Sequence, residues 1–411
     1  MTALANKIIA KHANLPSVLP GDIVIVDIDA VYIQDGNSPT IRKLFLDHGF
    51  NKVFDPKKIS VFFDHSVLPP NMKIANLLSN AEAFSRELNL NVYKAGEGIS
   101  HIIALEENIF EPGAIVLGSD SHTCTGGVNN TLSLGVGASD IAAAMVSGKS
   151  WLRVPDTTKI IISGKPRKEV TAKDLILYML SMFNSNDFLY QSIEYFGEWL
   201  SELPYDELAT IANMTVELGG KCCFFPDRLS KEDWLRDAKI SSDNYAKTIT
   251  IDIEGLEPYI AAPHSPSNSI PIKEFANKKI DMIFVGSCTN GKLNDIKIIA
   301  EVLNGKKIST ELQLIVTPSS KKIYLEALQK GYIEQIISAG GIITPPGCGS
   351  CLGTQGPIPA DGMNILSTMN RNFLGRMGNA KSSIYLCSPW VAALSAIGGE
   401  IPDFSEVREW N

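Results

Sequence analysis

The stretch Ala114–Thr125, AIVLGSDSHTCT, joins a short apolar run directly to a polar loop. The apolar run predicts a strand over Ala114 to Leu117, because it is short, β-branched and bounded by glycine. The loop that follows carries Asp120 and His122, whose side chains are suited to acid–base chemistry. Open α/β sheets bind ligands beyond the carboxyl ends of their strands. We therefore expect an α/β fold with a site at the end of this strand.

Two earlier segments repeat this order of strand and polar loop. Ile23 to Ile28 and Ile59 to Phe63 are β-branched apolar runs, and each is followed by a loop with candidate site residues. Small and apolar residues recur at helical spacing from Ala138 to Val146, which predicts a close-packed helix. A new strand is expected at Thr157 to Ile162, so a soft domain boundary falls after residue 155.

A second boundary falls near Pro263 to Pro271, a segment rich in Pro, Ser and Asn that is typical of linkers. The rest of the chain repeats the α/β pattern, with a strand at Lys279–Val285, a helix at Asp295–Leu303 and a strand at Leu312–Thr317. We expect three α/β units, at residues 1–155, 156–275 and 276–411.

Composition narrows the class of protein. The 411 residues are 45% hydrophobic and 20% charged, which is ample for more than one packed core. A net charge of -8 argues against a nucleic-acid surface, since phosphate binding needs a basic face. The start of the chain lacks the pattern of a secretion signal, and no run approaches a membrane span. Seven scattered cysteines suit reduced thiols, so we expect a cytoplasmic protein without disulfides or membrane partners.

Three cysteines lie in glycine-rich polar loops, Cys288 in GSCTNG and both Cys348 and Cys351 in PPGCGSCLG. A C-x-x-C pair fits a redox dithiol, half of a zinc site or two packed thiols, so spacing alone leaves these alternatives open. Closed iron-sulfur clusters usually take four cysteines. A trio with no adjacent His suggests a cluster with one open iron, which acts as a Lewis acid and not as an electron carrier.

The two cysteine loops resemble those of the aconitase superfamily, and within it those of isopropylmalate dehydratase large subunits and their homoaconitase relatives. Six further motifs match this family in order along nearly the whole chain, at Gln34–Pro39 (QDGNSP), Phe63–Ser66 (FDHS), Gly98–His101 (GISH), Gly118–Thr125 (GSDSHTCT), Ala212–Gly219 (ANMTVELG) and Asn370–Arg376 (NRNFLGR). The resemblance implies three aconitase-type α/β/α units around a cluster cleft, without the C-terminal swivel domain of single-chain aconitases.

The resemblance also implies roles for individual residues. It implies that Cys288, Cys348 and Cys351 bind one 4Fe-4S cluster with an open iron. It makes His65, paired with Asp64, the acid that protonates the leaving hydroxyl. His101 and His122 would contact substrate and iron-bound water, with Asp120 beside His122 and Glu217 as its carboxylate partner. Taken singly, each histidine is more simply explained as a hydrogen-bonded structural residue.

Substrate recognition is expected from a second set of residues. Guanidinium groups bind carboxylates bidentately, and a dicarboxylate or tricarboxylate needs at least two such groups. Without the family motif, two arginines on a loop would be assigned to the surface. The expected contacts to substrate or cluster come from Gln34, Ser121, Asn213, Asn290, Arg371 and Arg376.

The expected function is a hydro-lyase or isomerase that moves a hydroxyl between adjacent carbons of a malate-type acid, with isopropylmalate as first candidate. The loops at 36–38, 126–130 and 183–194 depart from the family pattern, so homocitrate or another 2-substituted malate stays open. Because the swivel domain is missing, a separate small subunit is expected to complete the active site. An iron-responsive RNA-binding protein and an electron carrier are rivals that the acidic charge and the missing fourth cysteine weigh against.

Overall fold

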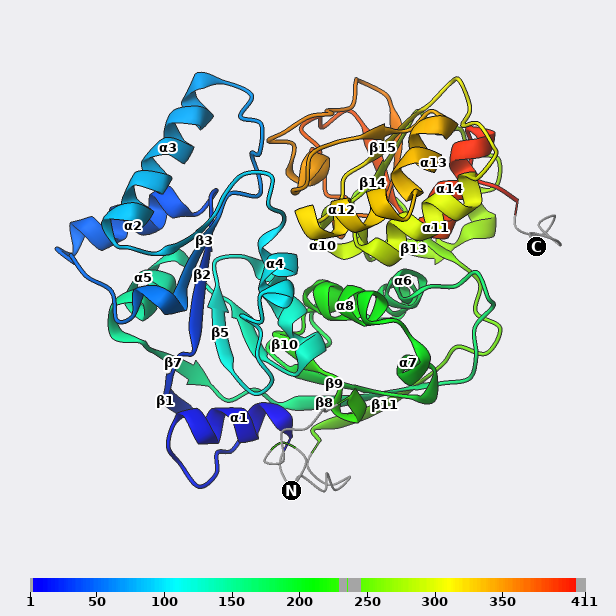
Figure 1. Ribbon diagram of the computed structural model, residues 1–411. Coiled ribbons are helices and arrows are strands. Elements are labelled where there is room, and N and C mark those ends of the chain that lie inside the picture. Colours follow the sequence, from blue (N-terminus) through cyan, green and yellow to red (C-terminus); the bar gives the residue numbers. More distant parts are fainter. Residues whose placement is uncertain (1–2, 229–234, 236–244, 404–411) are drawn as a thin grey trace.

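The computed structural model describes residues 3–228, 235 and 245–403. Strands and helices alternate along most of these residues and form three sheets in which neighbouring strands are mainly parallel. Figure 1 shows the first sheet on the left, the second at the bottom and the third at the upper right. The protein is therefore a mixed α/β protein, as the sequence predicts.

The first sheet has five parallel strands in the order β4-β3-β2-β5-β6. Its strands are β2 (Ala30–Gln34), β3 (Ile59–Phe62), β4 (Asn91–Tyr93), β5 (Ile115–Gly118) and β6 (Leu132–Gly135). The helices of this part are α1 (Leu4–His12), α2 (Ser38–Asp47), α3 (Met72–Glu87), α4 (Ser100–Glu106) and α5 (Ala138–Ser147). The expected strands at 59–63 and 114–117 and the expected helix at 138–146 are confirmed.

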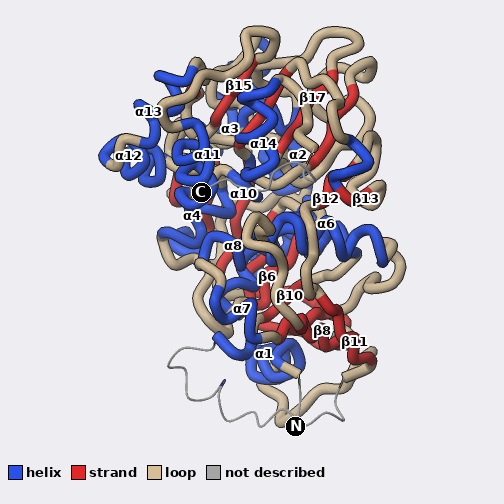
Figure 2. Tube along the Cα trace, turned by 90° about the vertical axis from the view of Figure 1, so that its right-hand side faces the viewer, coloured by secondary structure: helices blue, strands red, loops and turns tan. Residues whose placement is uncertain are grey.

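The second sheet has four parallel strands in the order β10-β9-β8-β11. They are β8 (Thr157–Ser163), β9 (Ser192–Phe196), β10 (Cys222–Phe224) and β11 (Lys247–Asp252). The accompanying helices are α6 (Ala172–Met182), α7 (Glu198–Glu202), α8 (Tyr205–Met214) and the 3-10 helix η3 (Thr215–Leu218). Figures 1 and 2 agree that α6 and α8 lie between this sheet and the third one.

The third sheet has seven strands in the order β13-β12-β18-β17-β14-β15-β16. Its strands are β12 (Tyr259–Ala261), β13 (Ser269–Pro271), β14 (Met282–Val285), β15 (Gln313–Val316), β16 (Ile342–Ile343), β17 (Asn364–Ser367) and β18 (Ser383–Leu386). Its helices are α10 (Ser287–Asn290), α11 (Leu293–Leu303), α12 (Lys321–Gln329), α13 (Tyr332–Ala339) and α14 (Pro389–Gly398), with the 3-10 helix η7 (Gly349–Leu352). β12 is antiparallel to both of its neighbours, and the other pairs are parallel.

The strand expected at residues 23–28 is confirmed, but it does not lead into a site loop. It is β1 (Ile23–Asp27), which pairs antiparallel with β7 (Lys149–Arg153) in a separate two-stranded ribbon. The strand that leads into the Gln34 loop is β2, whose five residues AVYIQ are mostly buried. Strands buried on both faces lack the alternation that marks half-buried strands, so the sequence pattern gives no clear signal for β2.

The Pro263–Pro271 segment is not a linker between units, because it contains the turn and second strand of the β12–β13 hairpin. The hairpin belongs to the third sheet, together with β14 to β18. The division into units at residues 155 and 275 remains a prediction, and the hairpin places the start of the third sheet at Tyr259.

Candidate active site

The predicted site residues follow the carboxyl ends of three neighbouring parallel strands. Gln34 ends β2, Asp64 and His65 follow β3, and Asp120 lies just beyond β5. Parallel strands end at the same edge of a sheet, so these side chains gather at one place. The cysteine loop of the third sheet meets this edge, because the Cys348 amide donates a 2.8 Å hydrogen bond to the Asp64 carbonyl.

His65 is held by two carboxylates. Its Nδ1 lies 2.7 Å from Asp64 Oδ1 and 3.1 Å from Asp35 Oδ1. Asp64 is fully buried and also accepts the Ser100 amide at 2.7 Å. Burial alone would lower the pKa of His65, but the charge of Asp64 and the hydrogen bonds to both aspartates raise it well above its ordinary value. The three groups therefore favour an imidazolium at neutral pH.

A second group joins two histidines through one carboxylate. Asp120 Oδ1 lies 3.1 Å from His101 Nε2 and 3.3 Å from His122 Nδ1, and it accepts the His122 amide at 2.8 Å. His122 Nε2 in turn lies 3.0 Å from Glu217 Oε1. Glu217 is buried on η3, where charge without a partner would be costly, and the histidine is that partner.

The same contacts shift the pKa values of Asp120, His122 and Glu217. Burial opposes ionisation of Asp120, yet hydrogen bonds and charge from His101 and His122 lower its pKa well below the ordinary value. Burial would also lower the pKa of His122, but its hydrogen bonds to Asp120 and Glu217 raise it. Repulsion between the charged ring and Arg371 acts in the opposite direction. The pKa of Glu217 is lowered by His122 and Arg371, which outweigh its burial.

The three cysteines predicted as cluster ligands are all buried, and polar hydrogens point at the sulfurs of Cys288 and Cys351. Asn213 Nδ2 and Asn370 Nδ2 donate to Cys288 Sγ at 3.2 and 3.4 Å, and Arg376 Nη2 lies 3.9 Å from Cys351 Sγ. Burial raises the pKa of Cys288 to about 11. Cys348 donates a hydrogen bond to Cys351 and thereby lowers the pKa of Cys351, with Arg376 acting in the same direction.

This donor set fits an iron-sulfur cluster. A cluster binds thiolates, and side-chain amides and a guanidinium stabilise negative sulfur in a site from which water is largely excluded. Four-coordinate structural zinc would need a fourth Cys or His, and among the described residues the histidines of the site lie close to carboxylates and not in one group with the three thiols. The residues at this place thus suit a cluster with three protein ligands better than a closed zinc site.

The loop of residues 370–376, the arginine loop, follows β17 of the third sheet and contacts Glu217 beside His122. Arg371 Nε forms a 2.8 Å ion pair with Glu217 Oε1, so this arginine already has a carboxylate partner inside the protein. Arg376 Nε is buried and has no hydrogen-bond partner among the residues that the structure describes. The Nε of Arg371 is likewise buried without a hydrogen bond among the described residues, so its contact with Glu217 is an ion pair, and Arg376 is the one of the two expected substrate-binding arginines without a carboxylate partner there.

The remaining predicted residues lie nearby with their side chains engaged in protein contacts. Gln34 Nε2 donates to Ser100 Oγ at 2.7 Å, and Ser121 Oγ is 3.5 Å from His122 Nδ1. Asn213 Nδ2 donates to Cys288 Sγ, as described above, and also to Thr125 Oγ1 at 2.9 Å. Asn290 Nδ2 donates to Asp295 Oδ1 at 2.9 Å, which turns it toward α11.

Sequence reasoning missed Asp35, Tyr32 and the direct part that Asn370 plays at Cys288. Asp35 is the second carboxylate on His65, and Tyr32 Oη lies 2.7 Å from His101 Nδ1. The sequence held a signal for Asp35, which directly follows Gln34 at the end of a strand. Tyr32 carries no such signal, because an aromatic residue inside a strand is ordinary core.

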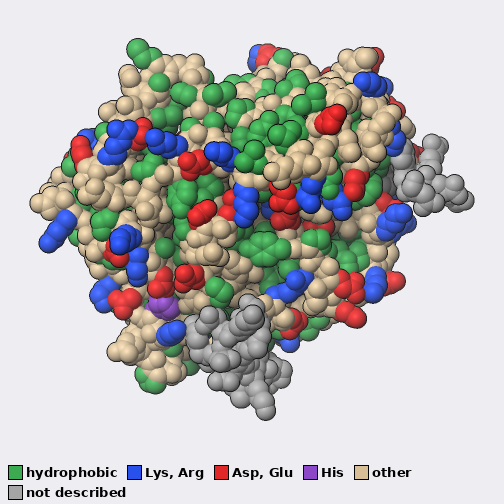
Figure 3. All heavy atoms as spheres, viewed as in Figure 1, with side chains coloured by type: hydrophobic (Ala, Val, Ile, Leu, Met, Phe, Trp, Pro, Cys, Tyr) green, Lys and Arg blue, Asp and Glu red, His purple; other side chains and the backbone are tan. Residues whose placement is uncertain are grey.

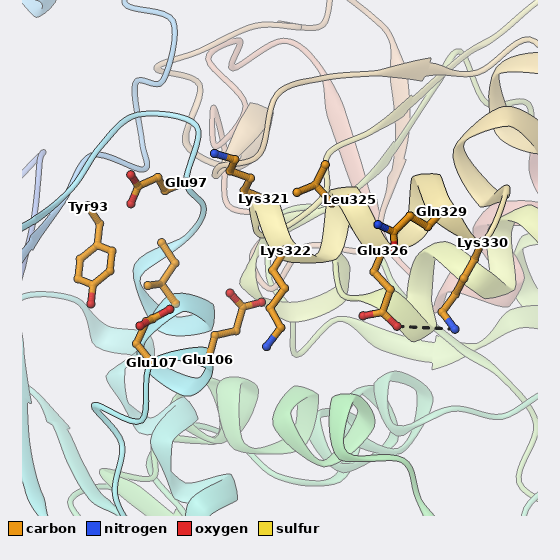
Figure 4. A pocket seen from close by; sticks show the side chains of 11 residues that line it. Tyr93, Glu97, Glu106, Glu107, Lys321, Lys322, Leu325, Glu326, Gln329 and Lys330 are labelled. Carbon is orange, nitrogen blue, oxygen red and sulfur yellow. Dashed lines mark ion pairs between the residues drawn. The ribbon is translucent and has the colours of Figure 1, made fainter.

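A groove on the surface lies elsewhere. It measures about 700 Å³ and runs between β4, α4 and α12, where Figure 4 shows Glu106 of α4 near Lys322 of α12. None of the predicted site residues lines it. On the face in Figure 3, acidic and basic side chains are interspersed across the middle, so this face carries no single sign of charge there.

Comparisons with known proteins agree with this geometry. A family model described as "Aconitase family (aconitate hydratase)" matches residues 7–279 and 273–399. The 3-isopropylmalate dehydratase large subunit 1 of Pyrococcus furiosus is 40% identical, with 98% of both chains covered. The large subunit from a Sulfurihydrogenibium species is also 40% identical, covering 99% of this chain and 97% of the relative.

A relative from Clostridium botulinum, a 3-isopropylmalate dehydratase large subunit, is 38% identical over 97% of this chain and 98% of its own. Among solved structures, the holo-form of Thermococcus kodakaraensis aconitase X matches with a TM-score of 0.55 at 17% identity. That match covers 92% of this chain and 87% of the other, and it shows likeness of fold. In the part of the chain that the structure describes, no helix combines the length and apolar character that crossing a bilayer requires. The chain belongs to the aconitase family of hydro-lyases.

Proposed function

We propose that the chain is the catalytic large subunit of an isopropylmalate isomerase, which interconverts 2-isopropylmalate and 3-isopropylmalate by dehydration and rehydration in leucine biosynthesis. The observation that carries the proposal is the meeting of three buried thiols with two histidine–carboxylate groups at one junction of two sheets. The names of the full-length relatives support the choice of substrate.

In this proposal Cys288, Cys348 and Cys351 hold one 4Fe-4S cluster with one iron free of protein thiolate. When bound, such a cluster supplies a Lewis acid for the substrate's hydroxyl and carboxylate. The chain contributes amide hydrogens from Asn213 and Asn370, which stabilise the charge on the Cys288 sulfur. These contacts make Cys288 the best supported ligand of the three.

His65 is the proposed general acid for departure of the hydroxyl. Its raised pKa keeps it protonated at neutral pH, and both carboxylates face Nδ1, so the Nε2 proton is the one directed at substrate. Asp64 and Asp35 hold the ring in place and favour its reprotonation by water after each transfer. His101 and His122 share Asp120, and both ring nitrogens of each already face protein groups, Tyr32 and Asp120 for His101 and Asp120 and Glu217 for His122. Their proposed part is to fix these carboxylates beside the substrate.

Charge recognition in this proposal rests first on Arg376. Its Nε lacks a partner among the described residues, and its guanidinium lies beside Cys351, next to the proposed cluster. A substrate carboxylate placed there would satisfy this buried donor and would approach the free iron at the same time. Arg371 acts mainly through Glu217, which it orients against His122.

The same machinery suits homocitrate or another 2-substituted malate, because it recognises the malate part and not the substituent. A direct comparison separates these substrates: kcat/KM is measured anaerobically for 2-isopropylmalate and for homocitrate, with a small subunit present. We expect kcat/KM to be at least about a hundredfold higher for 2-isopropylmalate, since a pocket shaped for one side chain discriminates by a few kcal/mol. A higher value for homocitrate would assign the chain to the homoaconitase reaction instead.

A further inference from the structure

A lysine of the second unit lies under the site loops without being part of the proposed chemistry. Lys173 is fully buried on α6, and its Nζ donates to the carbonyls of Thr368 and Met369 at 2.9 and 2.6 Å. These two carbonyls follow β17 directly and immediately precede the arginine loop. A lysine is seldom buried completely unless its charge has fixed partners, so the contact is a specific one.

The segment that carries the two carbonyls contacts the loop of Cys288 and continues into the arginine loop. The Thr368 hydroxyl accepts the Gly286 amide at 3.1 Å and donates to the Asn290 carbonyl at 3.1 Å, so it spans the loop that carries Cys288. Two residues beyond Thr368, Asn370 donates to Cys288 Sγ. Movement of the Thr368–Met369 backbone would therefore shift a thiol contact and the arginine loop together.

Lys173 is surrounded by charged groups and by contacts of α6 with the third sheet. Burial lowers its pKa to about 7, while Cys387, Asp174 and Asp295 favour the charged form and Lys292 opposes it. Asp174, on the same helix, closes the capping box with Thr171 and accepts the Tyr259 amide at 3.3 Å. The start of α6 is thus fixed to the third sheet by Asp174 as well as by Lys173.

We propose that Lys173 is a positioning residue that holds the loop from Thr368 to Arg376 in its working geometry, with Asn370 against Cys288 and Arg371 against Glu217. This role rests on the proposed function, because it is defined by the site that the loop serves. α6 belongs to the second unit, and its lysine binds the backbone at the end of β17 in the third unit. The second unit therefore holds the arginine loop of the third unit in place.

The test compares three variants with wild type. Lys173→Met has a side chain of similar length without a donor, and Lys173→Gln keeps an N–H donor without the charge. Leu177→Ala is the matched control, because it opens a cavity in the fully buried core of the same helix and leaves the contacts of the Lys173 Nζ in place. Amide hydrogen exchange of residues 369–378 is measured in the iron-free chain, and KM and kcat are measured in the reconstituted enzyme.

We expect exchange at residues 369–378 to be about tenfold faster in Lys173→Met, and less accelerated in Lys173→Gln, while Leu177→Ala leaves it at the wild-type rate. KM should rise about tenfold in Lys173→Met with a smaller change in kcat. Unchanged exchange in both lysine variants, or equal acceleration in Leu177→Ala, would overturn the proposal. An inactive wild type with the expected exchange pattern would instead count against the proposed function alone.

Discussion

At the scale of single residues, His65 and His122 each meet two carboxylates and differ in which ring nitrogens face them. His65 faces Asp64 and Asp35 at one ring nitrogen, which leaves the other for proton transfer. His122 meets Asp120 and Glu217 at opposite nitrogens, which leaves it no free ring position. Two histidines with raised pKa values are therefore suited to different tasks, one as an acid and the other as a fixed donor.

Replacing Glu217 by Gln tests this arrangement. The amide keeps the shape but loses the charge that His122 and Arg371 share, so the pKa of His122 should fall. Loss of a charge-assisted contact of about 1.5–3 kcal/mol corresponds to roughly a tenfold to hundredfold drop in kcat/KM. Glu202→Gln, on the exposed end of α7, is the control and should match wild type. Equal activity in both variants would make Glu217 a structural residue.

The cysteines allow a second test at this scale. Cys288→Ser should abolish iron binding, because two asparagine amides already point at this sulfur and a serine hydroxyl is a poor iron ligand. Cys222→Ser is a matched buried thiol on β10 and should retain full iron content. The measurement is iron and sulfide per chain after anaerobic reconstitution. Full iron content in Cys288→Ser would exclude this residue as a ligand.

At the scale of elements, the position of α4, the helix that carries His101, depends on a seam of contacts with Ser319 and Ser320, which follow β15 of the third sheet. Just before α4, the Ile99 amide donates to the Ser319 carbonyl at 2.8 Å, and Gly98 forms a bridge with Ser320 at the start of α12. Ser320 Oγ also donates to Glu106 Oε1 at 2.6 Å, at the other end of α4. The position of His101 is thus determined by two units at once.

Gly98→Ala should break this seam. A Cβ there would lie 2.6 Å from the Ser320 Cα and 2.7 Å from the Ser319 carbonyl oxygen, and both are backbone atoms that cannot turn aside. Gly96→Ala is a closely matched control, because Gly96 has a positive φ in the same loop but open space around it. We expect Gly98→Ala to lower the melting temperature well below that of Gly96→Ala and to reduce kcat/KM. Similar melting temperatures would show that the seam tolerates separation.

The first helix is held by a pH-dependent contact. His12 Nε2 lies 2.8 Å from Asp29 Oδ2, which also accepts the Ile115 amide of β5. Burial opposes the charged form of His12, but Asp29 and the Ile8 carbonyl raise its pKa. A raised folded pKa gives stability that is fully present below the unfolded value, about 6.5, and is lost as pH rises through the folded value.

His12→Gln should therefore lower the melting temperature more at pH 6 than at pH 9. The pKa of Asp29 is lowered in the folded chain by His12 and the Ile115 amide against burial, so its own contribution is lost only in acid, as pH falls below about 4. Melting curves of wild type and variant at both pH values measure the difference. A difference that grows with pH would contradict the assigned contact.

At the scale of the whole molecule, the sequence predicted the α/β class and the place of the site because both depend on local patterns. Strands such as β3 and β5 end in polar loops, and parallel strands bring such loops together. It did not predict contacts between distant segments, such as Tyr32 with His101 or Lys173 with Thr368. These depend on packing between segments that are far apart in the chain, which leaves no periodic trace in either segment. β2 was missed for a related reason, since burial on both faces removed its alternation.

The last prediction concerns what the chain needs from a partner, since relatives of this length are named large subunits. A malate-type substrate presents two carboxylates, whereas in the arginine loop Arg371 is already ion-paired with Glu217 and the Nε of Arg376 has no hydrogen-bond partner among the described residues. A second carboxylate contact is therefore expected from a small subunit. The chain alone should bind iron but show no turnover, and stepwise addition of the small subunit should raise activity until one is present per chain. Full turnover by the large subunit alone would contradict this division.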